Sequence, residues 1–117
     1  MIMMFGGVAE SLAGRSPEWV TAMQTEMMRM DGELRRSGEA VESRHLTDPT
    51  GATTVRLIDG APAPTDGPFA EIKESLAGYW VIEGTHERAV EIASRVAAAV
   101  EYPIEVRRVM DESPPQD

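Results

Sequence analysis

The chain has 117 residues, and its 20 acidic and 11 Lys or Arg residues give a formal net charge of -9. A predominantly negative surface repels phosphate backbones and anionic lipids, so we expect neither nucleic acid nor a membrane as a partner. The chain contains no cysteine, which excludes disulfides, thiolate nucleophiles and thiolate metal sites. No apolar run approaches the ~20 residues that cross a bilayer, and we expect a soluble, cytoplasmic protein.

This length fits a single domain with its own hydrophobic core. We place that domain at residues 1–110 and expect residues 111–117, which are rich in proline and charge, to be a disordered tail. A single sheet in a domain of this size leaves one face to be covered. A homodimer is therefore expected.

The first half of the chain predicts a short strand, a long helix and a second strand. Residues 1–5 are apolar and form the first strand, which Gly6-Gly7 ends. Ser16-Pro17-Glu18 starts the helix, because a capping hydroxyl, a proline and an acid all suit a helix N-terminus. Gly38 ends this helix, and residues 39–46 form a more polar strand. The helix carries one apolar stripe at steps of three and four, made by Val20, Met23, Met27, Met30 and Leu34.

A hairpin and a central strand are predicted next. Residues 53–58 form a strand. Asp59-Gly60, a dipeptide favoured in tight hairpins, forms the turn that follows it. Residues 61–64 can return only as an edge or irregular strand, since their two prolines cannot donate to a ladder. Residues 79–82 are aromatic and β-branched, which is typical of a central strand.

A second helix and a last strand complete the order of elements. Thr85 caps the helix. Apolar and charged residues alternate along residues 104–109, which is typical of a strand. The buried face of the helix is predicted at Ala89, Ile92, Ala93, Val96 and Val100. The order of strand, helix, hairpin, strand, helix and strand predicts a split βαβ fold of the α+β class, with two helices on one face of an antiparallel sheet.

The turn before the central strand carries a family resemblance. Asp66-Gly67-Pro68-Phe69, followed by Glu71, Lys73, Gly78 and Tyr79, resembles the signature of the DGPF, or YCII-related, family of small bacterial proteins. The similarity continues from residues 52–56 to residues 105–107. The resemblance implies a ferredoxin-like chain that dimerises face to face into an α/β barrel, with a pocket beside the sheet. Roles assigned within the family include lyase-like chemistry.

Asp66 is the first candidate for chemistry. Gly67 and Pro68 stiffen the turn that holds its carboxylate, and a partly desolvated carboxylate beside Phe69 or Trp80 would be a better general base. Alternatively, Asp66 only accepts hydrogen bonds from the backbone of its own turn. Both interpretations are open from the sequence, and the pocket that the resemblance implies at this corner favours the functional one.

His45 is the second candidate, because it lies where a predicted strand meets a loop and could act as the acid partner of Asp66. The alternative is an exposed histidine with no special role. The other histidine, His86, precedes Glu87 as in a zinc-binding helix, but Val90 stands where the second histidine would be, so no metal site is expected. A glycine-rich dinucleotide fingerprint is absent as well, and no cofactor is predicted.

A binding role is considered for one arginine and five apolar residues. Arg56 could hold an oxyanion, although arginines on strand faces commonly pair with local acids. The apolar candidates for the wall of a substrate pocket are Trp19, Met23, Met27, Phe69 and Trp80, although a methionine stripe at helical spacing is often plain core.

Three functions are considered, and the last of them is an assembly protein whose only task is dimerisation. The first is a cofactor-independent isomerase, lyase or cyclase that uses His45 and Asp66 as acid and base on a small, partly apolar metabolite. The second is a non-catalytic module that binds a small molecule or a protein, in which Asp66 only shapes its turn. Loss of turnover on Asp66→Asn would favour the first, and loss of stability alone the second.

Overall fold

We analysed a computed structural model of the chain, which describes residues 1–6 and 12–110. The strands are β1 (Ile2–Phe5), β2 (Ala40–His45), β3 (Thr53–Ile58), β4 (Ala61–Asp66), β5 (Leu76–Ile82) and β6 (Glu105–Val106), and the helices are α2 (Pro17–Ser37) and α3 (His86–Val100). The tail expected at residues 111–117 lies outside the described residues, as do residues 7–11. Within the described ranges, no helix combines the length and the apolar character needed to span a membrane.

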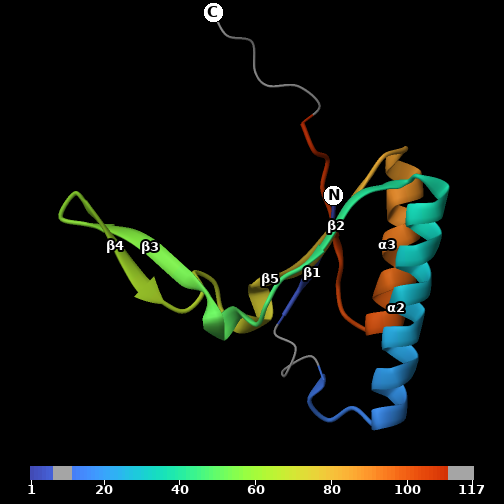
Figure 1. Ribbon diagram of the computed structural model, residues 1–117, viewed down its shortest axis with the longest axis horizontal. Coiled ribbons are helices and arrows are strands. Elements are labelled where there is room, and N and C mark those ends of the chain that lie inside the picture. Colours follow the sequence, from blue (N-terminus) through green and yellow to red (C-terminus); the bar gives the residue numbers. More distant parts are fainter. Residues whose placement is uncertain (7–11, 111–117) are drawn as a thin grey trace, which may run out of the picture.

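Four strands form an antiparallel sheet in the order β2-β5-β1-β6. Both helices lie on one face of this sheet (Figure 1). The two central strands, β5 and β1, come from opposite halves of the chain, which is the order of a ferredoxin-like fold. The predicted α+β class with two helices on one face is therefore confirmed. The described residues of a single chain form no closed barrel.

The helices begin and end where the sequence predicts, because their caps are made locally. Ser16 Oγ accepts a hydrogen bond of 3.1 Å from the Trp19 amide, and Gly38 ends α2 in the left-handed conformation with φ of 79°. Thr85 caps α3 in the same way as Ser16 caps α2. The faces that these helices turn to the sheet form one core with strands β1 and β5, made by Ile2, Met30, Leu34, Trp80, Ile92, Ala93 and Val96.

The last strand is shorter than predicted. An alternating strand was expected at residues 104–109, whereas β6 contains only Glu105 and Val106. Its sole strand neighbour is β1, and Val106 already pairs with Ile2, at the start of that strand. A final backbone hydrogen bond runs from the Arg107 amide to the Met1 carbonyl at 2.8 Å. The ladder stops there because its partner strand ends.

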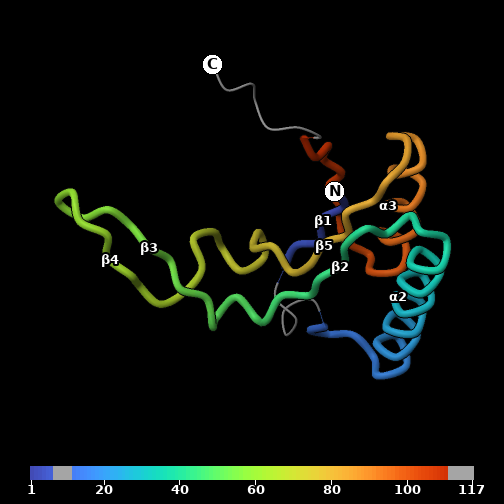
Figure 2. Tube along the Cα trace, turned by 45° about the horizontal axis from the view of Figure 1, so that its top comes forward, coloured from blue at the N-terminus to red at the C-terminus, as the bar shows by residue number. Residues whose placement is uncertain are grey.

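Strands β3 and β4 form a separate two-stranded sheet, which extends away from the helices as an arm (Figures 1 and 2). Asp59 and Gly60 both have positive φ, 52° and 79°, which is the geometry of a tight two-residue hairpin turn. The predicted hairpin is therefore confirmed. Residues 61–64, expected as an edge or irregular strand, belong to the regular strand β4, which pairs with β3 on one side only.

Candidate functional site

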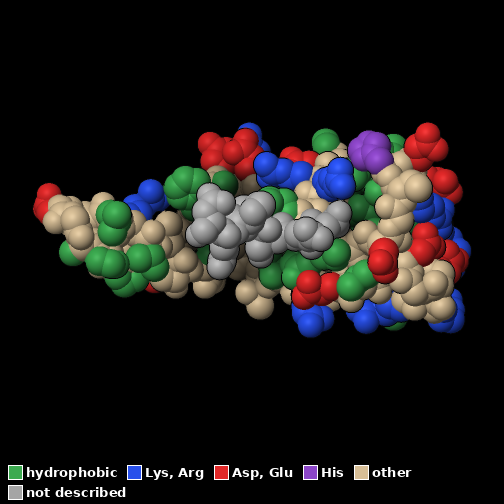
Figure 3. All heavy atoms as spheres, turned by 90° about the horizontal axis from the view of Figure 1, so that it is seen from above, with side chains coloured by type: hydrophobic (Ala, Val, Ile, Leu, Met, Phe, Trp, Pro, Cys, Tyr) green, Lys and Arg blue, Asp and Glu red, His purple; other side chains and the backbone are tan. Residues whose placement is uncertain are grey.

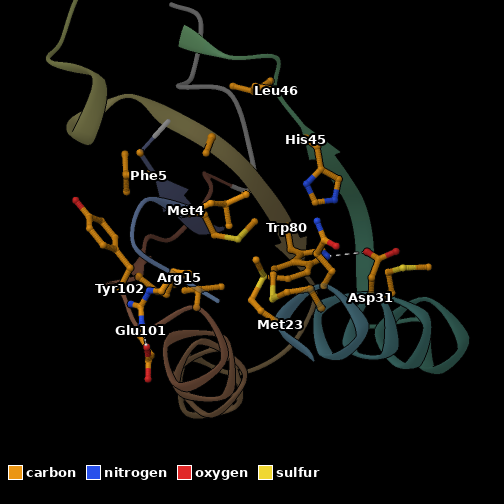
Figure 4. A pocket seen from close by; sticks show the side chains of 18 of the residues that line it. Met4, Phe5, Arg15, Met23, Asp31, His45, Leu46, Trp80, Glu101 and Tyr102 are labelled. Carbon is orange, nitrogen blue, oxygen red and sulfur yellow. Dashed lines mark hydrogen bonds and ion pairs between the residues drawn. The ribbon is translucent and has the colours of Figure 1, made fainter. Parts of the chain in front are cut away.

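A pocket of about 570 Å³ lies between α2 and the helix-covered face of the sheet. This volume falls within the range of small-molecule sites. Its walls come from five elements and are mainly apolar, with Met4, Trp19, Met23, Met27, Trp80 and Ile104 among the lining residues. Figure 4 shows Met4, Met23 and Trp80 around one hollow, with His45 above it and Asp31 at one side. The pocket is thus lined mainly by apolar side chains, with few ionisable groups among them.

His45 is the histidine of this pocket, and a glycine lies beside it. His45 ends β2, where it pairs with Gly78 of β5, and its ring points toward the hollow (Figure 4). A methyl group at Gly78 would lie 3.5 Å from His45 Nδ1 and 3.2 Å from Met4 Cε. Gly78 therefore leaves room for the Met4 side chain and lies in van der Waals reach of the imidazole.

Asp31 is one of two acids that line the pocket, and its carboxylate is held by three side chains. Oδ1 accepts hydrogen bonds from Trp80 Nε1 at 2.8 Å and from Ser43 Oγ at 2.9 Å, and Oδ2 accepts one from Arg35 Nε at 2.7 Å. Burial of the carboxylate raises its pKa, but the hydrogen bonds from Trp80, Arg35 and Ser43 together outweigh burial and lower the pKa. Asp31 therefore stays ionised and joins α2 to β2 and β5.

The sequence analysis did not single out Asp31. One sequence feature could have pointed to Asp31. It lies four residues after Met27, which lies four residues after Met23, so an acid continues a helix face that is otherwise apolar. An acid in such a row needs a partner. That partner is the indole of Trp80, which lies 49 residues further along the chain, so no local sequence pattern connects the two residues.

The other end of the pocket holds a pair of opposite charges. Arg15 forms an ion pair with Glu101, just after α3, and its guanidinium carbon lies 4.2 Å from the centroid of the Trp19 ring. Nearby, Tyr102 donates a hydrogen bond of 3.0 Å to the Lys73 carbonyl. Because Arg15 already has an acid and an aromatic face as partners, its charge is partly satisfied within the protein.

A comparison with profiles of protein families shows to which family the chain belongs. A profile of the YCII-related domain matches residues 8–113. The chain belongs to the YCII-related family. The resemblance drawn from the segment around Asp66 is thereby confirmed, and none of the curated proteins compared with the chain matches it.

The pocket of this YCII-related domain brings together five of the eight residues singled out from the sequence. These are Trp19, Met23, Met27, His45 and Trp80. Trp80 is 1% exposed and also belongs to the core, whereas His45 is exposed at the pocket rim. The methionines of the α2 stripe therefore have two roles. Met30 is fully buried in the core, while Met23 and Met27 line the pocket.

The remaining three predicted site residues lie at the base or on the arm of the domain. Asp66 is the last residue of β4, is exposed, and does not line the pocket of His45. Arg56 lies with its guanidinium carbon 5.6 Å from the centroid of the Phe69 ring. Phe69 is 81% exposed and borders a second, shallower hollow at the base of the arm. Within one chain, His45 and Asp66 thus belong to different surfaces.

Proposed function

We propose that this YCII-related domain is an enzyme that moves protons on a small, partly apolar organic molecule without a cofactor, and that His45 is the group that carries the proton. The observation that supports this proposal is a single imidazole aimed into a pocket whose other walls are mainly apolar and include four methionines and two tryptophans. Such walls bind an apolar or aromatic body, and the imidazole then faces its functional group.

The reaction class that suits one imidazole is an isomerisation, elimination or cyclisation through an enolate. His45 would take a proton from the carbon beside a carbonyl, and the electrons of that C–H bond would form the enolate. The resulting imidazolium would return the proton to another carbon or to a leaving group, so that no net proton is consumed. Gln24 lines the same pocket, and its amide is a neutral donor suited to the enolate oxygen.

Asp31 has a different task in this proposal. Its oxygens are occupied by Trp80, Ser43 and Arg35, so it holds the indole wall of the pocket and places a fixed negative charge on that side. Asp66 is left out of the proton transfer because it does not line the pocket.

The test is proton exchange rather than a particular product. A panel of enolisable aromatic ketones and β-keto esters is incubated with the protein in D2O, and loss of the α-proton signal is followed by NMR. His45→Gln is expected to slow catalysed exchange by about 10² to 10⁴-fold. His86→Gln is the matched control, since His86 is the other histidine, is exposed at the start of α3 and lies outside the pocket. Equal exchange in the His45 and His86 variants would refute the proposal.

A non-catalytic binding module is the second candidate. Four methionines line the pocket, namely Met4, Met23, Met27 and Met28, and flexible thioethers suit a surface that adapts to several ligands. This alternative expects saturable binding of apolar probes, weakened when Met23→Glu places a charge in the wall, with no exchange above the rate in buffer. If compounds bind to the pocket but none of them exchanges its α-proton, the result would favour the binding module over the enzyme.

A further inference from the structure

A pocket with mainly apolar walls needs a second polar contact besides His45, because a few well-placed polar groups fix the direction in which a ligand binds. Apart from His45, Arg15 is the only basic residue among the described residues that line the pocket. Figure 4 shows Arg15 and Tyr102 on the opposite side of the hollow from His45. Arg15 is therefore placed to hold the end of a ligand that His45 does not face.

Two arginines on the helices show how this protein uses a guanidinium group. Acidic and basic side chains lie next to one another over the helices (Figure 3). Arg29 binds the two carboxylate oxygens of Glu26 through Nε and Nη2, at 3.0 and 2.6 Å. Arg88 binds Glu39 through the same two nitrogens, at 2.7 and 3.2 Å. These nitrogens form a fork that matches the two oxygens of a carboxylate, and in both arginines an acid of the chain fills the fork.

In Arg15 the same fork is free. Nη1 forms the ion pair with Glu101, whereas neither Nε nor Nη2 donates to a residue in the described part of the chain. The guanidinium carbon lies 4.2 Å from the centroid of the Trp19 ring, and a guanidinium stacked on an aromatic face keeps its edges available. The Arg15 side chain is 35% exposed, so an incoming anion can reach it. The fork is thus held in place, with no acceptor from the described residues.

Glu101 supports this arrangement at a position where a glycine is common. It follows α3 in the left-handed conformation, with φ of 53°, and helices commonly end in a left-handed glycine. A glycine would have no carboxylate to pair with Arg15. Glu101 also leaves room for a second acid, since Arg29 binds Glu26 and Glu33 together. The ion pair therefore positions Arg15 without using up its capacity to bind a carboxylate.

We infer that the free fork of Arg15 binds a carboxylate of the substrate. This inference rests on the proposed function, which places the enolisable carbon at His45. The substrate class is then a keto acid in which an apolar or aromatic spacer separates the carboxylate from the enolisable carbon, and the spacer lies along the methionine and tryptophan walls. A primary amide of the same shape carries no charge, so the guanidinium would bind it less tightly.

Binding of matched pairs tests the inference without turnover. The probes are para-acetylbenzoate, para-acetylphenylacetate and β-benzoylpropionate, which differ in the spacer, and each is compared with its primary amide by ligand-observed NMR. The best-fitting acid is expected to bind about 10 to 100-fold more tightly than its amide, and Arg15→Gln should reduce this ratio to about one. Arg29→Gln is the matched control and should retain the ratio, since Arg29 is an exposed arginine that pairs with acids but lies outside the pocket.

The inference is overturned by a ratio near one in the unaltered chain or by a ratio that Arg15→Gln leaves unchanged. A ratio in Arg15→Lys as large as in the unaltered chain also overturns it, because lysine keeps the charge without the fork. Failure of every acid in the panel to bind at millimolar concentration has the same consequence. Helix content and thermal melting establish that each variant is folded.

Proton exchange is a separate measurement, so the two proposals can fail independently. Catalysed exchange with no preference for the acid over its amide would retain the proposed function and refute the role of Arg15. A preference for the acid that depends on Arg15, without exchange of any probe, would support carboxylate binding by Arg15 and refute only the enzyme.

Discussion

Removing the Asp31 carboxylate is expected to destabilise the domain through the donors that it leaves behind. Trp80 is 1% exposed and Ser43 is 8% exposed, so neither the indole N–H nor the hydroxyl can turn to bulk water in Asp31→Ala. A buried donor left without its acceptor costs about 1 to 3 kcal/mol, and the hydroxyl can rotate toward another acceptor, which places it at the lower end. The free energy of unfolding should fall by about 2 to 4 kcal/mol.

The same carboxylate makes stability depend on pH with a definite sign. Its pKa is lowered in the folded protein, because the hydrogen bonds from Trp80, Arg35 and Ser43 outweigh the effect of burial. An acid with a lowered folded pKa stabilises the protein above its unfolded pKa, near 4, and this contribution is lost as the pH falls through the folded pKa. The difference in stability between the unaltered chain and Asp31→Asn should therefore be largest near pH 7 and shrink below about pH 4.

Urea unfolding at pH 7 and at pH 3 measures both effects. Asp31→Asn is the matched control, since its amide oxygen can still accept from the Trp80 indole while its shape is nearly unchanged. It should lose less stability than Asp31→Ala at pH 7. Equal losses in the two variants, or a loss below about 0.5 kcal/mol in Asp31→Ala, would refute the argument that unsatisfied donors dominate.

Two further predictions concern the surroundings of the pocket. In Gly78→Ala the new methyl would lie 2.9 Å from the Arg44 carbonyl oxygen, so thermal or urea unfolding should show a loss of about 1 to 3 kcal/mol, with a displaced His45 ring signal in the NMR spectrum. An unchanged His45 signal would contradict its close approach to Gly78. Ser16→Ala removes the acceptor of the Trp19 amide at the start of α2 and should lower stability by about 1 kcal/mol, whereas Ser16→Asp should retain most of it. Equal stability of these two Ser16 variants would contradict the capping role.

Much of the fold could be predicted because its signals are local. The cap made by Ser16, the left-handed glycine at Gly38 and the turn at Asp59-Gly60 each involve residues within four positions of one another. Hydrogen bonds over such short separations form in the same way in most proteins, which is why these sequence patterns are informative. The family follows from the segment after Asp66 for a related reason, since an ordered run of residues is itself a property of the sequence.

The composition of the pocket, in contrast, was decided only in three dimensions. His45 and Asp66 lie 21 positions apart and both border turns, yet β2 enters the main sheet beside β5, whereas β4 leaves it as part of the arm. Asp31 and Trp80 are 49 positions apart and meet because α2 packs on the sheet. From the sequence alone, the residue types and the helix that carries the methionine wall were determined. The partners of Asp31 and the place of His45 at the pocket depended on strand pairing and helix packing, which are contacts between distant segments that no local pattern encodes.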